Sequence, residues 1–307
     1  MSTSQVAGRE PWLAVVLSLF SPGLGQIYCG EIVRGLVLFL ASLLFAPLVV
    51  LTALLPPATP VLVALLLAAL TVLGAYLYAV VAAYRAARKL REHFEPREYN
   101  RLLVYVLFLL VGVLYPVGGA WYLPHVFEAF YLPTQSMVPT FLEGDHVLAD
   151  KLAYRKAMPK RGDVVIFRVP QQPGRTWIKR VIGLPGDTVE VKDNEVFLNG
   201  KRLNRDRVPA SSMSETAGVA EGDVFAESNA GSRYLILIGK GKAPDYAKTT
   251  VPEGRFFVLG DHRHRSLDSR DAELGFVPLA NILGNVPYIY YPAGSWDRFG
   301  AVRTGAD

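Results

Sequence analysis

The stretch 35–84, which contains no charged side chain, constrains this sequence more than any other feature. Prolines at 56, 57 and 60 divide it into two apolar runs, 35–55 and 61–84. Each run reaches the length of about 20 residues that a helix needs to cross a hydrocarbon core. A third apolar run, 102–123, ends in aromatic side chains, which favour the membrane–water interface. We therefore predict a transmembrane anchor of three helices over 35–123. Three adjacent uncharged spans are too many for the core of a soluble protein.

The basic loop 85–101 predicts the orientation of this anchor. It carries six Lys or Arg residues, whereas the proline loop at 56–60 carries none. Basic loops stay on the cytoplasmic side, so everything after residue 123 is predicted to be extracytoplasmic. We expect a multi-pass protein of the inner (plasma) membrane with its C-terminal domain on the periplasmic side. No span contains Asp, Glu, Lys, Arg or His, which argues against a transporter or channel.

Residues 1–34 are predicted to form a short membrane-associated module that re-enters or half-spans the bilayer. The apolar segment PWLAVVLSLF is only ten residues long before SPGLGQIYCG interrupts it. A cleavable signal peptide is an alternative, although Gly23-Leu24-Gly25 is a poor cleavage site. Cys29 is the single cysteine, so no disulfide can form within the chain, and the residues before it do not favour lipidation.

Residues 124–307 predict a mostly β domain with antiparallel strands. Short β-branched or aromatic runs at 163–169, 187–200, 232–238 and 255–261 follow one another without long helical intervals. Asp193-Asn194 and Asn199-Gly200 are typical of hairpin turns. The stretch 204–232, rich in Ser, Ala, Gly and Glu, is interpreted as a long loop or small insertion.

Ser136 in YLPTQSMVPT (131–140) is a candidate nucleophile, but no Gly-x-Ser-x-Gly motif surrounds it and no histidine motif partners it. Lys179 in RTWIKRVIGLPGD (175–187) could serve as its base. On a strand it shares a face with Trp177 and Val181, and burial lowers the pKa of a lysine toward neutrality. The alternative is an ordinary lysine whose ammonium reaches water.

The segment GDHRHRSLDSRD (260–271) places Ser266, Asp268 and Arg270 close together in the chain. The residues alone leave two other interpretations open. One is a metal site formed by His262 and His264 with Asp261 or Asp268. The other is a Ser-His-Asp triad that pairs Ser136 with one of these histidines.

Five ordered blocks resemble the sequence boxes of the type I signal peptidases, which are membrane-anchored Ser/Lys endopeptidases that remove signal peptides from exported proteins. The blocks are SMVPT (136–140), GDHVLADK (144–151), KRGDVVIFRVP (160–170), WIKRVIGLPGD (177–187) and GDHRHRSLDSR (260–270). The resemblance covers about residues 125–292. It implies a mostly β catalytic core with a second, more variable β region at about 204–250.

The resemblance also implies roles for individual residues. Ser136 matches the nucleophile, Lys179 the general base and Ser266 the serine that orients the lysine. Asp268 and Arg270 match the pair that braces this loop. The Thr134 hydroxyl would form the oxyanion hole together with the Ser136 N–H. The substrate pocket would include Leu132, Pro133, Gln135, Met137, Phe141, Trp177 and Ile178.

The expected partners are signal peptides of exported preproteins and the lipid bilayer. No nucleic acid, cofactor or metal is expected, and the protein is expected to be a monomer. Substrates should carry small residues at the first and third positions before the cut. The alternatives are a catalytically inactive membrane receptor of the same fold and a metal-dependent hydrolase that uses His262 and His264. Self-cleaving repressors also use a Ser/Lys pair, but they carry a DNA-binding head in place of membrane spans.

Three features depart from the family pattern. Thr134-Gln135 stands where the family often has Ser-Gly, and His262 stands where it has Asn. The third departure is the number of spans before the nucleophile, which is larger than usual in the family. Threonine keeps the hydroxyl, whereas Gln135 is expected to reshape the rim of the cleft. His262 and His264 inherit no role from the family and are interpreted as structural or solvent-facing.

Overall fold

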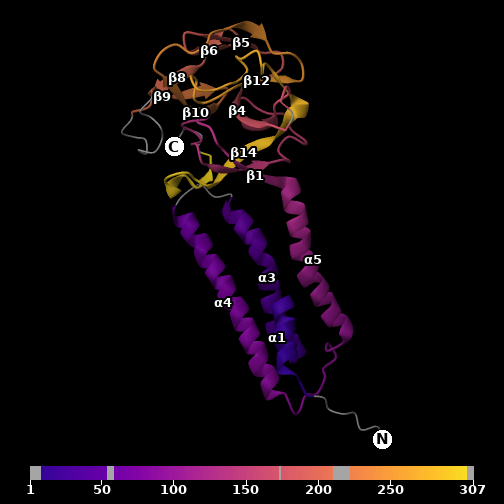
Figure 1. Ribbon diagram of the computed structural model, residues 1–307. Helices are drawn as coiled ribbons and strands as arrows, with labels where there is room; N and C mark the ends of the chain where they lie inside the picture. Colours follow the sequence, from indigo (N-terminus) through magenta and orange to yellow (C-terminus); the bar gives the residue numbers. More distant parts are fainter. Residues whose placement is uncertain (1–7, 54–58, 173, 210–221, 303–307) are drawn as a thin grey trace. The chain divides into compact units, whose positions relative to one another are not determined.

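Helices form the first part of the chain and strands the second in the computed structural model, which describes residues 8–53, 59–172, 174–209 and 222–302 (Figure 1). By contacts between residues, the chain divides into two compact units, with the main boundary between Pro124 and His125. The five helices described are α1 (Pro11–Phe20), α2 (Leu24–Tyr28), α3 (Ile32–Ala53), α4 (Thr59–Lys89) and α5 (Leu102–Val126).

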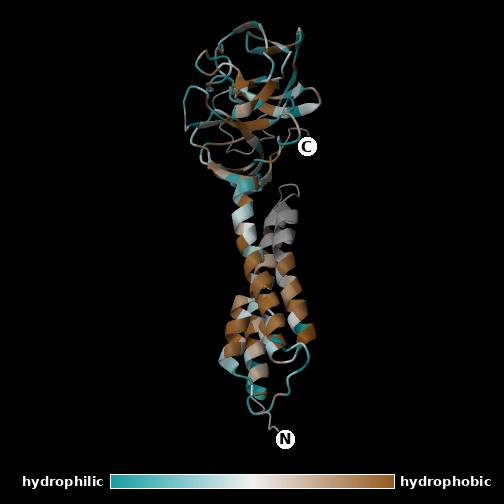
Figure 2. Ribbon diagram, turned by 90° about the vertical axis from the view of Figure 1, so that its right-hand side faces the viewer, coloured by the Kyte–Doolittle hydropathy of each residue, from teal (hydrophilic) through white to brown (hydrophobic). Residues whose placement is uncertain are grey.

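The three apolar runs are helical over their described residues and fall in α3, α4 and α5, and α4 continues five residues beyond Tyr84 into the basic loop. Two helical segments of the described chain, Leu66–Lys89 and Leu102–Val126, are long and apolar enough to cross a membrane. Figure 2 shows that hydrophobic residues dominate these helices, whereas polar and apolar residues are interspersed in the strand-rich unit.

The N-terminal module packs onto α4 through small residues. α1 ends at Phe20, and Gly23, at φ +94°, allows the chain to turn into α2. The buried residues at this junction include Ala14, Tyr28, Cys29, Ala83 and Ala87. A Cβ added at Gly25 would overlap the Ser18 hydroxyl and the Ala14 carbonyl, so the two short helices can approach only at a glycine. Residues 1–7, included in the predicted module, lie outside the described chain.

The second unit is built from antiparallel strands, which confirms the predicted fold class. Its large sheet has the order β1-β2-β14-β3-β4-β12-β13, with β15 paired to β14. The bounds of these strands are β1 Phe127–Tyr131, β2 His146–Asp150, β3 Val164–Arg168, β4 Thr176–Gly183, β12 Arg255–Leu259, β13 Val277–Pro278, β14 Ile282–Tyr291 and β15 Gly300–Ala301. Two 3-10 turns, η3 Leu279–Asn281 and η4 Trp296–Arg298, complete this part. β1 lies at one end of the sheet, with its pairing only to β2 in the described residues.

Two smaller sheets form the second β region. One has the order β11-β5-β6-β7 and the other β10-β9-β8. Their strands are β5 Thr188–Lys192, β6 Glu195–Leu198, β7 Lys201–Arg202, β8 Asn204–Arg207, β9 Gly222–Asn229, β10 Ser232–Gly239 and β11 Tyr246–Thr250. The hairpin between β5 and β6 turns at Asp193 and Asn194, which have φ of 51° and 64°, and the next turns at Asn199 and Gly200. Both predicted turns are therefore confirmed.

Of the two interpretations of 204–232, the long loop is wrong where the structure has strands, whereas the β region that the resemblance implies at about 204–250 is observed. β8 pairs with β9, and β9 pairs with β10 along its whole length. On β9, Val224 and Ala226 are buried, but so are the polar residues Glu227 and Asn229, so the strand lacks the regular apolar and polar alternation that predicts a strand. Residues 210–221 of this stretch lie outside the described chain.

Candidate active site

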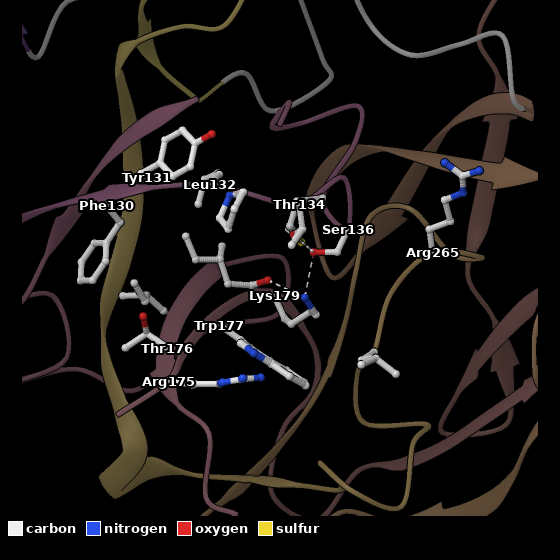
Figure 3. Close-up of a pocket in the computed structure, with 15 residues that line it drawn as sticks. Phe130, Tyr131, Leu132, Thr134, Ser136, Arg175, Thr176, Trp177, Lys179 and Arg265 are labelled. Carbon is white, nitrogen blue, oxygen red and sulfur yellow. Dashed lines mark hydrogen bonds between the residues drawn. The ribbon is translucent and has the colours of Figure 1, made fainter. Parts of the chain in front are cut away.

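Ser136 and Lys179 meet although 43 residues separate them in the chain. Ser136 lies in the turn that follows β1, the strand at one end of the large sheet. Lys179 lies in the middle of β4. Its Nζ is 3.0 Å from Ser136 Oγ and also donates a hydrogen bond to the Ile178 carbonyl at 3.0 Å (Figure 3). A hydroxyl and an amine in this contact can exchange a proton directly.

Burial makes Lys179 a suitable base. Only 4% of its surface is exposed, and the ring centroid of Trp177, on the same face of β4, lies 5.6 Å from Nζ. Desolvation lowers the pKa of Lys179 from 10.5 to about 8, against the opposing effect of Asp268 and Asp261. A substantial fraction of this lysine is therefore neutral slightly above neutral pH.

Each of the two carboxylates near Lys179 is paired with an arginine. Asp268 accepts two hydrogen bonds from the Arg270 guanidinium, at 2.8 and 2.9 Å, one from the Arg270 backbone N–H at 3.3 Å and one from the Gly260 N–H at 3.0 Å. Asp261 accepts two from Arg180, at 2.7 and 2.6 Å. Both carboxylates are fully buried. The Arg180–Asp261 pair fixes the loop 260–270 against β4, whereas the Arg270–Asp268 pair holds the loop itself together.

Thr134 and Ser266 both lie close to Ser136. The Thr134 and Ser136 hydroxyl oxygens are 3.2 Å apart. A Cβ added at Gly260 would overlap the Ser266 side chain and lie 2.5 Å from the Ser136 carbonyl, so the glycine allows Ser266 to approach Ser136. The Ser266 hydroxyl donates to the Leu267 carbonyl at 3.4 Å, and the described contacts include no hydrogen bond between Ser266 and Lys179. The orienting contact that the resemblance implies is thus not formed in this conformation.

A cleft of about 510 Å³ opens beside Ser136 and Lys179. Of the predicted pocket residues, Leu132, Pro133, Met137, Trp177 and Ile178 line it. Phe141 does not, because it is buried in the core beneath the cleft, and Gln135 does not, because its amide is bonded to Glu143 and Arg265. The sequence reasoning missed Phe130, Tyr131, Ile166, Arg175, Thr176, Arg265 and Leu267, which also line the cleft. Arg175 could have been predicted to line the cleft, because it directly precedes β4 and alternates with Trp177 and Lys179. No local sequence pattern predicts this position for Ile166 or Arg265.

His262 and His264 have different environments. His262 is buried, which agrees with the structural rather than the solvent-facing alternative for this residue, and its Nδ1 accepts a hydrogen bond from the Arg265 N–H at 3.2 Å. His264 Nδ1 accepts one from the Gly239 N–H at 3.1 Å, at the end of β10. No group of three or more His, Cys, Asp or Glu side chains with the arrangement of a metal site occurs in the described residues.

Comparisons with known proteins match the same part of the chain. The family described as "Signal peptidase, peptidase S26" matches residues 101–291. A signal peptidase I of Rickettsia typhi is 31% identical over 195 residues, which cover 54% of this chain and 72% of that protein. A probable signal peptidase I-1 of Synechocystis is 31% identical over 185 residues, which cover 57% and 77% of the two chains. A crystal structure of a signal peptidase I from Enterococcus faecalis is 32% identical, covers 42% of this chain and 97% of the other, and gives a TM-score of 0.27.

Proposed function

This chain belongs to the signal peptidase family, peptidase S26, and we propose on that premise that Ser136 and Lys179 cleave N-terminal signal peptides from exported preproteins. The observation that carries the proposal is the 3.0 Å contact between Ser136 Oγ and the buried Lys179 Nζ. Cleavage of a reporter preprotein by the full chain in detergent, compared with its Ser136→Ala variant, tests it.

In the proposed reaction, neutral Lys179 takes the proton of Ser136 as Oγ attacks the scissile carbonyl. The Ser136 N–H and the Thr134 hydroxyl donate to the oxyanion that forms. Lys179 then protonates the leaving amine, and the C–N bond breaks to give an acyl-enzyme on Ser136. The Lys179 amine next removes a proton from a water molecule, which attacks the carbonyl of the acyl-enzyme. The bond to Ser136 Oγ then breaks, Oγ regains a proton, and the signal peptide leaves as a carboxylate.

We propose that the substrate binds as an extended strand along the cleft, in the manner of strand addition to a sheet. β1 is an edge strand, and the residues that follow it form one wall of the cleft while 175–179 form the other. The apolar side chains of Leu132, Met137 and Ile178 suit small residues before the cut. We propose cleavage after a small-x-small motif on this basis.

We also propose a multi-pass membrane anchor with the peptidase unit outside the cytoplasm. α3, α4 and α5 supply the spans, and the loop 85–101 between α4 and α5 carries the basic residues that stay on the cytoplasmic side. Under this proposal, a topology reporter fused at residue 95 should lie in the cytoplasm, and one fused at residue 150 should lie outside it.

The activity is expected to rise with pH through about pH 8. Only the neutral amine can accept the Ser136 proton, and its fraction increases as the pH passes the Lys179 pKa of about 8. Below that midpoint kcat/KM should fall by about tenfold per pH unit, because one proton inactivates the base. Measurement of kcat/KM on a peptide from about pH 6 to about pH 10 tests this. An acidic limb centred near the ordinary lysine pKa would contradict it.

The Thr134→Val variant is expected to lose about 10²–10³-fold in kcat, because one oxyanion donor is removed while the shape of the side chain is kept. KM should change little, since the hydroxyl acts on the charge that develops during attack. Thr134→Ser, which keeps a hydroxyl, is the matched control and should retain most of the rate. Equal kcat values for Thr134→Val and Thr134→Ser would remove Thr134 from the oxyanion hole.

A further inference from the structure

Two departures from the family pattern, Gln135 and His262, both make contact with Arg265. Arg265 Nη1 donates to Gln135 Oε1 at 3.1 Å, across 130 residues of sequence. The Arg265 backbone N–H donates to His262 Nδ1 at 3.2 Å. The His262 backbone N–H in turn donates to the Ser136 carbonyl at 3.1 Å. The segment that carries Arg265 is therefore attached directly to the nucleophile turn.

Glu143 fixes the orientation of the Gln135 amide. Gln135 Nε2 donates to Glu143 Oε2 at 3.0 Å, which leaves Oε1 to accept from the guanidinium. The opposite orientation would place the amide oxygen against the carboxylate and the amide NH₂ against the guanidinium, so both contacts would be lost. Gln135 thus connects Glu143 and Arg265 through a neutral group and holds the Arg265 side chain at the cleft.

Arg265 lines the cleft on the far side of the nucleophile. Figure 3 shows Phe130, Tyr131 and Arg175 on one side of Ser136 and Arg265 on the other. The apolar wall formed by Leu132, Met137 and Ile178 accepts the small residues before the cut under the proposed function. The chain that continues beyond the scissile bond then passes Arg265.

We propose that Arg265 is a specificity-determining residue, which favours an acidic side chain and disfavours a basic one at the first positions after the cut. This inference rests on the proposed function, and Gln135 is its positioning residue. Among the described residues that line the cleft, Arg265 is the charged side chain on this side, Arg175 lies at the opposite end, Lys179 reacts as the neutral amine, and none is acidic. A charge on the departing segment of the substrate therefore encounters a positive edge near the nucleophile.

The test uses the full chain in detergent and three reporter preproteins that carry Glu, Gln or Lys at the first position after the cut. Each rate is divided by the rate on the Gln reporter, so that losses of general activity cancel. Wild type is expected to cleave the Glu reporter about fivefold faster than the Lys reporter. This ratio combines the attraction of Arg265 for Glu with its repulsion of Lys, each of the size usual for an exposed charge contact. Raising NaCl from about 0.05 M to about 0.5 M should reduce this ratio.

The variants should separate charge from structure. Arg265→Glu should reverse the preference, Arg265→Lys should keep it, and Gln135→Gly, which restores the family residue, should weaken it. Arg175→Glu is the matched control: this arginine lines the opposite end of the cleft, so the preference after the cut should persist. A Glu/Lys ratio near one in wild type, or one that Arg265→Glu leaves unchanged, would overturn the inference while the Gln reporter is still cut. Failure to cut any reporter would instead contradict the proposed function.

Discussion

The Ser136→Ala protein is expected to leave a reporter preprotein uncleaved, with kcat lowered by about 10⁴–10⁶-fold. Alanine lacks the Oγ atom that attacks the scissile carbonyl in the proposed reaction, and loss of a serine nucleophile in other peptidases has effects of this size. The substitution removes one half-buried hydroxyl, so the fold should be kept. The measurement is the rate of appearance of the mature protein, with enzyme in excess so that slow cleavage is detected.

Ser228→Ala is the matched control for this experiment. Ser228 is also half-buried but lies on β9, in the second β region. The control should cleave at the wild-type rate and unfold at the same temperature. If Ser136→Ala processed the reporter at a rate comparable to this control, Ser136 would not be the nucleophile, and the Ser/Lys mechanism would have to be abandoned.

The Lys179→Arg protein is expected to be almost equally inactive. Arginine keeps the positive charge and the length of the side chain, but its pKa above about 12 leaves no neutral form to accept the Ser136 proton. Burial also makes the larger guanidinium difficult to accommodate, because Lys179 is only 4% exposed. Single-turnover cleavage at pH 7 and at about pH 9 would measure the loss, which the higher pH should not restore.

A surface substitution and a histidine substitution complete this test. Lys192→Arg changes an exposed lysine on β5 in the same way and should leave cleavage unchanged. His264→Ala should keep most of the activity, because this ring contacts the backbone at the end of β10. Substantial cleavage by Lys179→Arg together with its loss in His264→Ala would favour a histidine-dependent mechanism.

Local patterns in the sequence predict those parts of the fold in which one short-range effect dominates. The run 102–123 predicts α5 because a long apolar segment without charges has few alternatives to a helix. The turns at Asp193-Asn194 and Asn199-Gly200 are predictable because few residues adopt positive φ. β9 escaped prediction, since its burial depends on pairing with β8 and β10 and its own side chains are mostly small or polar.

In the candidate site, too, local patterns predict some contacts and not others. Alternation along β4 places Trp177 and Lys179 on one face, and the observed ring-to-ammonium distance of 5.6 Å agrees with that expectation. The contact of Lys179 with Ser136 was implied by the family resemblance and could not follow from spacing, because it depends on the order of strands in the large sheet. The contact of Gln135 with Arg265 joins two loops 130 residues apart and has no counterpart in the family pattern.

The pairing of Asp261 with Arg180 and of Asp268 with Arg270 has a consequence for how this catalytic unit can be reused. Although Asp261 and Asp268 lie close to Lys179, each is paired with its own guanidinium, and together they raise the pKa of the amine less than desolvation lowers it. The basicity of Lys179 is then set by its exclusion from water, which is a local property. We expect Lys179 to keep its lowered pKa when the strand-rich unit is joined to a different anchor, because the groups that determine this pKa all lie within that unit.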